Sequence, residues 1–171
     1  ALAGSGAAPL RPDPPAAVES EAETIAKCLA DLESPAAETR RAAVLILGKY
    51  MHPAAVQAVM QALGDPAAAV RRAAVVALLD EGTLTPQAAG TMLAMLDDPD
   101  VHIRRIVSSS LPKLVVTARQ PTRPAPLRPG PRPAAPAFAP DVRAAARAAF
   151  TDADPTVRKN MLSHYSYFLA D

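Results

Sequence analysis

Few side chains in this 171-residue sequence have the type and spacing that catalysis or metal binding requires. The three histidines, His52, His102 and His164, form no HxxxH pair, and Cys28 is the only cysteine. A zinc site brings together three or four nitrogen or sulfur ligands, so we expect no metal and no cofactor. The sequence also shows no Ser, His and Asp arrangement and no glycine-rich phosphate loop. These patterns indicate a protein that is not an enzyme.

The most regular charged pattern is a polar residue that stands six positions before an arginine. It occurs four times, in the pairs Ser34 and Arg40, Asp65 and Arg71, Asp98 and Arg104, and Asp152 and Arg158. This spacing lets the carboxylate of a turn reach the guanidinium of an adjacent helix, and such pairs are strong when bidentate. We interpret the pairs as a structural ladder between repeated units, with Asp65 and Arg71, like Asp98 and Arg104, within hydrogen-bonding range.

A second basic residue directly follows each of these arginines, giving a set of Arg41, Arg72, Arg105 and Lys159. One position along a helix is a rotation of about 100°, so this set should form a separate basic stripe. A solvated helix face is the plainer interpretation of the stripe. Binding of an acidic peptide or of a nucleic acid backbone is the functional interpretation.

Residues 119–140 hold eight prolines together with Arg119, Arg123, Arg128 and Arg132. So many prolines exclude helix and paired strand and favour an extended, polyproline-like segment, which we call the strap. Its arginine and proline spacing fits an R-x-x-P-x-x-P ligand of SH3-type grooves, although such a match arises easily in this composition. A simple tether is the alternative. Our hypothesis is that the strap is the main partner-binding element and that the repeats are its rigid mount.

The elements that carry these residues are predicted to be helices. Seven positions after each ladder arginine stands a large side chain that we expect to be buried, namely Leu47, Leu78, Leu111 and Tyr165. Between the arginine helices lie segments with apolar residues at helical spacing, such as Val56, Val59 and Leu63. Each repeat is therefore helix, turn, helix.

Local signals place several helix ends. Ser20 with Glu23 forms a possible capping box, and Thr85 before Pro86 indicates an N-cap followed by the first helical residue. Asp141 is predicted to cap a helix over residues 142–150. Pro112 is predicted to kink the third arginine helix or to end it near Leu111.

The run D-P-x-x-x-V-R-R-A-A in residues 65–74 resembles the second-helix signature of HEAT repeats, close to the subgroup named after phycobilin lyases. The resemblance covers roughly residues 18–118 and 141–170. It implies an all-α fold, an α-solenoid of about four HEAT-like helix pairs whose second helices line a concave, ligand-binding surface. We expect an irregular N-terminal arm over residues 1–17 and a solenoid over 18–171 that the strap interrupts.

Function is only loosely indicated by these features. The net charge of +1 predicts no partner, although residues 1–38 hold seven acidic and two basic residues. We expect a protein–protein interaction scaffold or accessory subunit whose partners have an acidic surface. The alternatives are a nucleic-acid binder that uses the basic stripe and, from the resemblance alone, a bilin-lyase-like enzyme.

The compartment is left open by the sequence. The single cysteine excludes an intrachain disulfide, and no apolar run is long enough to span a membrane. The residues "ALA" before Gly4 have the small-x-small pattern of a signal cleavage site. Export is therefore an alternative to a cytoplasmic location.

Overall fold

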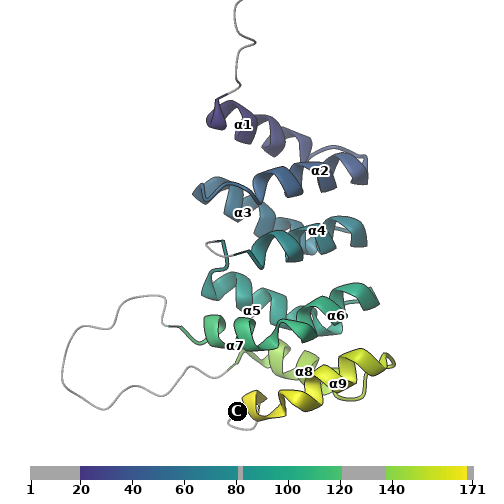
Figure 1. Ribbon diagram of the computed structural model, residues 1–171. Helices are drawn as coiled ribbons and strands as arrows, with labels where there is room; N and C mark the ends of the chain where they lie inside the picture. Colours follow the sequence, from purple (N-terminus) through teal and green to yellow (C-terminus); the bar gives the residue numbers. More distant parts are fainter. Residues whose placement is uncertain (1–19, 81–82, 121–137, 169–171) are drawn as a thin grey trace, which may run out of the picture.

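The computed structural model describes residues 20–80, 83–120 and 138–168, which fold into helices without a strand (Figure 1). The α-helices of these residues are α1 Glu21–Asp31, α2 Ala37–Leu47, α3 Pro53–Gln61, α4 Ala68–Leu78, α5 Pro86–Ala94, α6 Val101–Ser109, α7 Leu111–Ala118, α8 Pro140–Ala149 and α9 Pro155–Ser163. Short 3-10 turns follow α3 (η1, Ala62–Gly64), α5 (η2, Met95–Asp97) and α9 (η3, Tyr165–Phe168).

The helices stack as four antiparallel pairs in two layers. The first layer holds α1, α3, α5 and α8, and the second holds α2, α4, α6 and α9 (Figure 1). Within the second layer, α2 packs on α4, α4 on α6 and α6 on α9. The described residues therefore form an α-solenoid of four helix pairs, and the extra helix α7 packs against α5.

Local capping explains where several of these helices begin. The Ser20 hydroxyl accepts a hydrogen bond from the Glu23 N–H, and the Glu23 carboxylate accepts one from the Ser20 N–H at 2.8 Å, which completes the capping box. Thr85 caps α5 ahead of Pro86. The prediction for Asp141 is wrong. Because Pro140 is favourable as the first helical residue, α8 begins two residues earlier than predicted, and Asp141 lies in its first turn.

Pro112 divides the second helix of the third repeat. The helix α6 ends at Ser109, and α7 begins at Leu111 with Pro112 in its first turn, where the missing N–H costs nothing. A continuous helix would need that N–H as a donor, so the chain turns at Ser110 and starts again. The new direction lays α7 along α5 and carries the chain toward Arg119.

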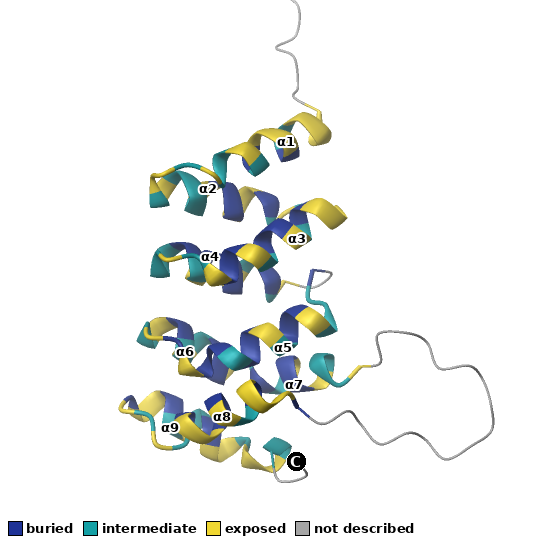
Figure 2. Cartoon of the chain, turned by 180° about the vertical axis from the view of Figure 1, so that it is seen from behind, coloured by how far each residue is buried: buried dark blue, intermediate teal, exposed yellow. Residues whose placement is uncertain are grey.

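The core runs between the two layers, as the buried residues in Figure 2 show. Leu47, Leu78 and Leu111 are at most 1 % exposed, as their common position in the repeat predicts. The corresponding prediction for Tyr165 is wrong, because its side chain is 53 % exposed. The helix α9 ends at Ser163, so Tyr165 starts the turn η3, and no further helix pair among the described residues covers it.

Candidate functional site

Among the described residues, one equivalent bidentate ion pair of the ladder lies at each junction between successive repeats. Each arginine uses Nε and one terminal nitrogen to bind both carboxylate oxygens of the aspartate in the next repeat. The pairs, with their two N–O distances, are Arg40–Asp65 (2.7 and 2.9 Å), Arg71–Asp98 (2.9 and 2.9 Å) and Arg104–Asp152 (2.6 and 3.1 Å). This geometry is the strong form of a charge-assisted hydrogen bond.

The six-residue spacing within a repeat serves a different contact. Arg71 Nη1 donates to the backbone oxygen of Asp65 at 2.9 Å, and Arg104 Nη1 donates likewise to Asp98. The aspartate carboxylate also accepts from the backbone N–H two residues on, as Asp65 does from Ala67 at 2.8 Å. Each ladder carboxylate therefore binds the arginine of the preceding repeat, while the arginine of its own repeat binds its backbone oxygen.

Two ladder aspartates, Asp65 and Asp152, are held in their charged form. Hydrogen bonds from Arg40 lower the pKa of Asp65 below its ordinary value, and Arg104 lowers the pKa of Asp152 in the same way. The side chains of these pairs are mostly covered, which limits screening by water and salt. The ionic groups of these three rungs are therefore engaged between repeats.

Two residues of the basic stripe are engaged by carboxylates. Arg41 pairs with Glu38 at 3.0 Å, and Arg105 binds Asp154 with N–O distances of 3.1 and 2.5 Å. The second pair links α6 to α9 and lowers the pKa of Asp154, which also caps α9. We did not single out Asp154 in the sequence, although its place in the Asp-Pro of the fourth repeat was a usable signal. Much of the expected stripe is therefore neutralised within the fold.

A surface at the other end of the second layer combines apolar and basic side chains. Leu45 and Val76 are 39 % and 51 % exposed, and each lies one helical turn beyond a stripe residue, Arg41 or Arg72. A groove of about 440 Å³ runs beside them, lined by Leu45, Gly48, Lys49, Val76, Ala77, Leu79 and Asp80. We call the groove with Arg41 and Arg72 the α2–α4 surface.

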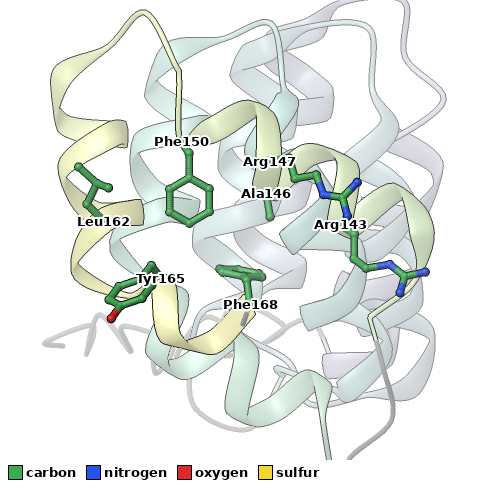
Figure 3. Close-up of a pocket in the computed structure, with 7 residues that line it drawn as sticks. All are labelled: Arg143, Ala146, Arg147, Phe150, Leu162, Tyr165 and Phe168. Carbon is green, nitrogen blue, oxygen red and sulfur yellow. The ribbon is translucent and has the colours of Figure 1, made fainter. Parts of the chain in front are cut away.

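The last repeat carries a second, more apolar groove of about 310 Å³ (Figure 3). Arg143, Ala146, Arg147 and Phe150 line it from α8 and the residue after it, Leu162 from α9, and Tyr165 and Phe168 from η3. We call it the terminal groove. The sequence pattern treated Tyr165 as core and did not indicate this groove.

The two described ends of the strap are packed together against η3. The Arg119 guanidinium lies 4.5 Å from the ring centroid of Phe138, and its Nη2 donates to the backbone oxygen of Tyr167 at 3.0 Å. Phe138 is buried and contacts the ring of Phe168 at 5.6 Å between centroids. The other strap arginines, Arg123, Arg128 and Arg132, lie outside the described residues.

Within residues 20–80, 83–120 and 138–168, no group of three or more His, Cys, Asp or Glu side chains could hold a metal ion. None of the helices described above combines the length and apolar character that a membrane span needs.

A family model described as HEAT repeats matches residues 23–111, which is more than half of the chain. This match agrees with the stacked helix pairs and the repeated Asp-Pro turns. The chain belongs to the HEAT-repeat family. A comparison with curated proteins gives no match. HEAT repeats generally mediate protein–protein interaction and are typically not catalytic, so the exposed surfaces of this HEAT-repeat chain are the places to look for its function.

Proposed function

We propose that this chain is a non-enzymatic scaffold or accessory subunit that binds a partner protein through the α2–α4 surface. The observation that supports the proposal is the exposure of Leu45 and Val76 side by side on two packed second helices. Leu45 follows Arg41 by four positions, and Val76 follows Arg72 by four positions, so each apolar side chain lies beside a basic one on the same helix face. Exposed apolar side chains gathered beside a groove are typical of binding surfaces.

The chemistry of this surface favours an amphipathic segment with acidic side chains. Such a segment would lay its apolar face over Leu45 and Val76 and direct carboxylates toward Lys49 and Arg72. Lys49 and Arg72 are basic residues for which no ion pair is found among the described residues. An acidic partner would therefore gain charge pairs without displacing existing ones.

Nucleic acid is the weaker alternative. A phosphate backbone is bound by an array of uncompensated cations, and carboxylates already engage two of the four stripe residues, Arg41 and Arg105. Leu45 and Val76 would also have no role in contacting phosphates. Binding to duplex DNA that weakens steeply with salt would favour this alternative.

The proposal is tested by co-purification from the native source with three versions of the chain. The wild-type chain should retain a specific protein that the double variant Leu45→Glu, Val76→Glu loses. Val116→Glu is the matched control, because Val116 is an exposed valine on α7, outside the α2–α4 surface. Circular dichroism must show that all three chains melt alike. Retention of the same protein by the double variant, or of none by the wild type, would contradict the proposal.

The same co-purification experiment also tests the hypothesis that the strap is the main partner-binding element. Replacing residues 121–137 by a short glycine–serine linker should abolish association if the strap is the main partner-binding element. Association that survives this change and is lost with Leu45→Glu, Val76→Glu would place the binding on the α2–α4 surface alone.

A further inference from the structure

The groove of the α2–α4 surface has small residues at its floor and larger side chains on its two walls. Gly48 and Ala77 are half-buried where α2 and α4 meet, and a Cβ on Gly48 would lie 2.6 Å from the Cβ of Ala77. Leu45 and Val76 are exposed beside them, one on each helix. The space above the two small residues can therefore hold one large apolar side chain of a ligand, which is the usual form of an interface anchor.

Two exposed cations of this surface, Lys49 and Arg72, pair with no carboxylate among the described residues. Lys49 lies just beyond the C-terminal end of α2, and Arg72 lies in the first half of α4. Arg41, the counterpart of Arg72 on α2, is bound by Glu38. The cations that are open to a ligand therefore stand on different helices and at opposite ends of the surface.

The pattern of this surface does not continue onto the third repeat. Ser109 of α6 stands at the position of Leu45 and Val76, and Arg105 is bound by Asp154. A ligand that crossed from α4 to α6 would meet neither an exposed apolar side chain nor an unpaired cation at these two positions. A ligand that runs along α2 and α4 keeps both kinds of contact.

We propose that the partner segment bound at the α2–α4 surface is an α-helix with one large apolar side chain between two carboxylates, which lie about two helical turns apart. This inference rests on the proposed function and specifies the ligand of the same surface. The carboxylates would pair with Arg72 and Lys49, whose levels along the groove differ by about 12 Å. The apolar side chain would cover Gly48 and Ala77. Asp80 lines the α4 side of the groove across from Lys49, so the carboxylate at this end would lie on the α2 side.

A helix suits this groove better than an extended chain because of its backbone. Alternate side chains of an extended segment have a similar spacing, but its N–H and C=O groups would need partners outside the segment. Beside the groove, the backbone groups of α2 and α4 are used within these helices, as in the bond from the Gly48 N–H to the Val44 oxygen at 2.9 Å. A helix satisfies its own backbone and presents the three side chains on one face.

Two peptide libraries displayed on phage serve as probes without knowledge of the natural partner. The first randomises one face of a surface helix in a stable helical bundle, and the second randomises an unstructured peptide of equal length. Both are selected on the full-length wild-type chain after removal of clones that bind Leu45→Glu, Val76→Glu. The helical library should yield clones with an apolar residue between two acidic ones, and the unstructured library should yield none of comparable affinity.

Charge reversal then locates the two contacts. R72E should weaken binding of a selected helix by about fivefold or more, and exchange of one of its two glutamates for lysine should restore binding to R72E. K49E should behave likewise with the other glutamate. R147E, at an exposed arginine of α8 in the first layer, is the matched control and should change nothing. Because Arg72 and Lys49 are exposed, all variants should melt like the wild type.

Selected helices without acidic residues, selection from the unstructured library alone, or no clone specific for the wild-type chain would overturn this inference. The co-purification experiment judges the proposed function separately. A natural partner that is lost from Leu45→Glu, Val76→Glu, together with a failed helix selection, would retain the function and reject the helical ligand. A partner that this double variant keeps would reject both.

Discussion

At the scale of single residues, the ladder arginines and aspartates carry several contacts at once. Arg71 binds two backbone oxygens of its own turn and both carboxylate oxygens of Asp98. Asp98 also accepts from the Asp100 N–H and so fixes the turn before α6. The same side chains therefore shape the turn within a repeat and set the position of the next repeat, which makes them sensitive sites for substitution.

The lowered pKa values of Asp65 and Asp152 predict a specific loss of stability in acid. In the unfolded chain these carboxyls titrate near 3.8, and in the fold they stay charged to lower pH. Their contribution to the free energy of unfolding is thus present above about pH 5 and is lost as the pH falls through 3.8 toward the folded values. Chemical denaturation between pH 7 and pH 2 should show this loss in the wild type and a smaller one in D65N/D152N. Equal losses in the two proteins would contradict the role assigned to the rungs.

Burial at the repeated leucine position predicts a large effect for a single deletion of side-chain volume. Leu78→Ala should lower the free energy of unfolding by about 2 to 5 kcal/mol, because Leu78 is 1 % exposed within the core. Val76→Ala on the same helix is the matched control, and it should change the free energy by no more than about 0.5 kcal/mol. Urea titrations of both variants provide the measurement. Similar losses for the two would show that the helix phase is misassigned.

At the scale of elements, the second helices lie close enough to require a small residue at one point. A Cβ placed on Gly48, at the end of α2, would lie 2.6 Å from the Cβ of Ala77 on α4. The backbone of Gly48 is in the ordinary helical region, so the glycine serves the close approach of the helices rather than an unusual turn. The contact lies directly under the α2–α4 surface.

We therefore expect Gly48→Ala to destabilise the protein and Gly48→Ala with Ala77→Gly to recover part of the loss. The first change forces α2 and α4 apart, and the second removes the clashing methyl group. Gly90→Ala in α5 is the control, since nothing lies within 4 Å of a Cβ there, and it should stabilise the protein by up to about 1 kcal/mol. Thermal melts of the variants give the answer. If the double variant recovers no stability, the clash with Ala77 is not the cause of the loss in Gly48→Ala.

The sequence predicts most of the elements because each has a local signal. These signals depend only on residues within about one helical turn. The start of α5 could therefore be inferred from Thr85 and Pro86, and the break before α7 from Pro112. The exposure of the Tyr165 side chain could not be inferred from the sequence. Its place in the repeat is that of a core residue, and only the absence of a following helix pair among the described residues exposes it.

At the scale of the whole molecule, the ladder was predictable as a pattern but not in its pairing. A six-residue spacing brings Arg71 to the Asp65 backbone, and only the stacking of repeats brings Arg40 to the Asp65 carboxylate. The α2–α4 surface and the terminal groove were missed for the same reason. As large apolar residues, Leu45, Val76 and Leu162 look like core residues in the sequence. They are exposed because no neighbouring helix of the described stack packs over them.

The strap joins the stack through its two ends, which limits how it can be removed. Phe138 is 7 % exposed and packs under Arg119 and against Phe168, so deleting all of residues 119–140 would damage the fold itself. Replacing only residues 121–137 by a short linker should leave the melting temperature nearly unchanged. Phe138→Ala should lower the free energy of unfolding by about 3 to 5 kcal/mol. A large loss of stability on the linker replacement would show that the central strap supports the stack.

Hydrogen–deuterium exchange of the chain with and without its co-purified partner tests the central claim most directly. Binding at the α2–α4 surface predicts slower exchange along α2 and α4, with little change along α1 and α3, which lie in the other layer of the same repeats (Figure 1). Protection in α9 and η3 would report occupation of the terminal groove in addition. Protection confined to α1 and α3, with α2 and α4 unchanged, would contradict the account.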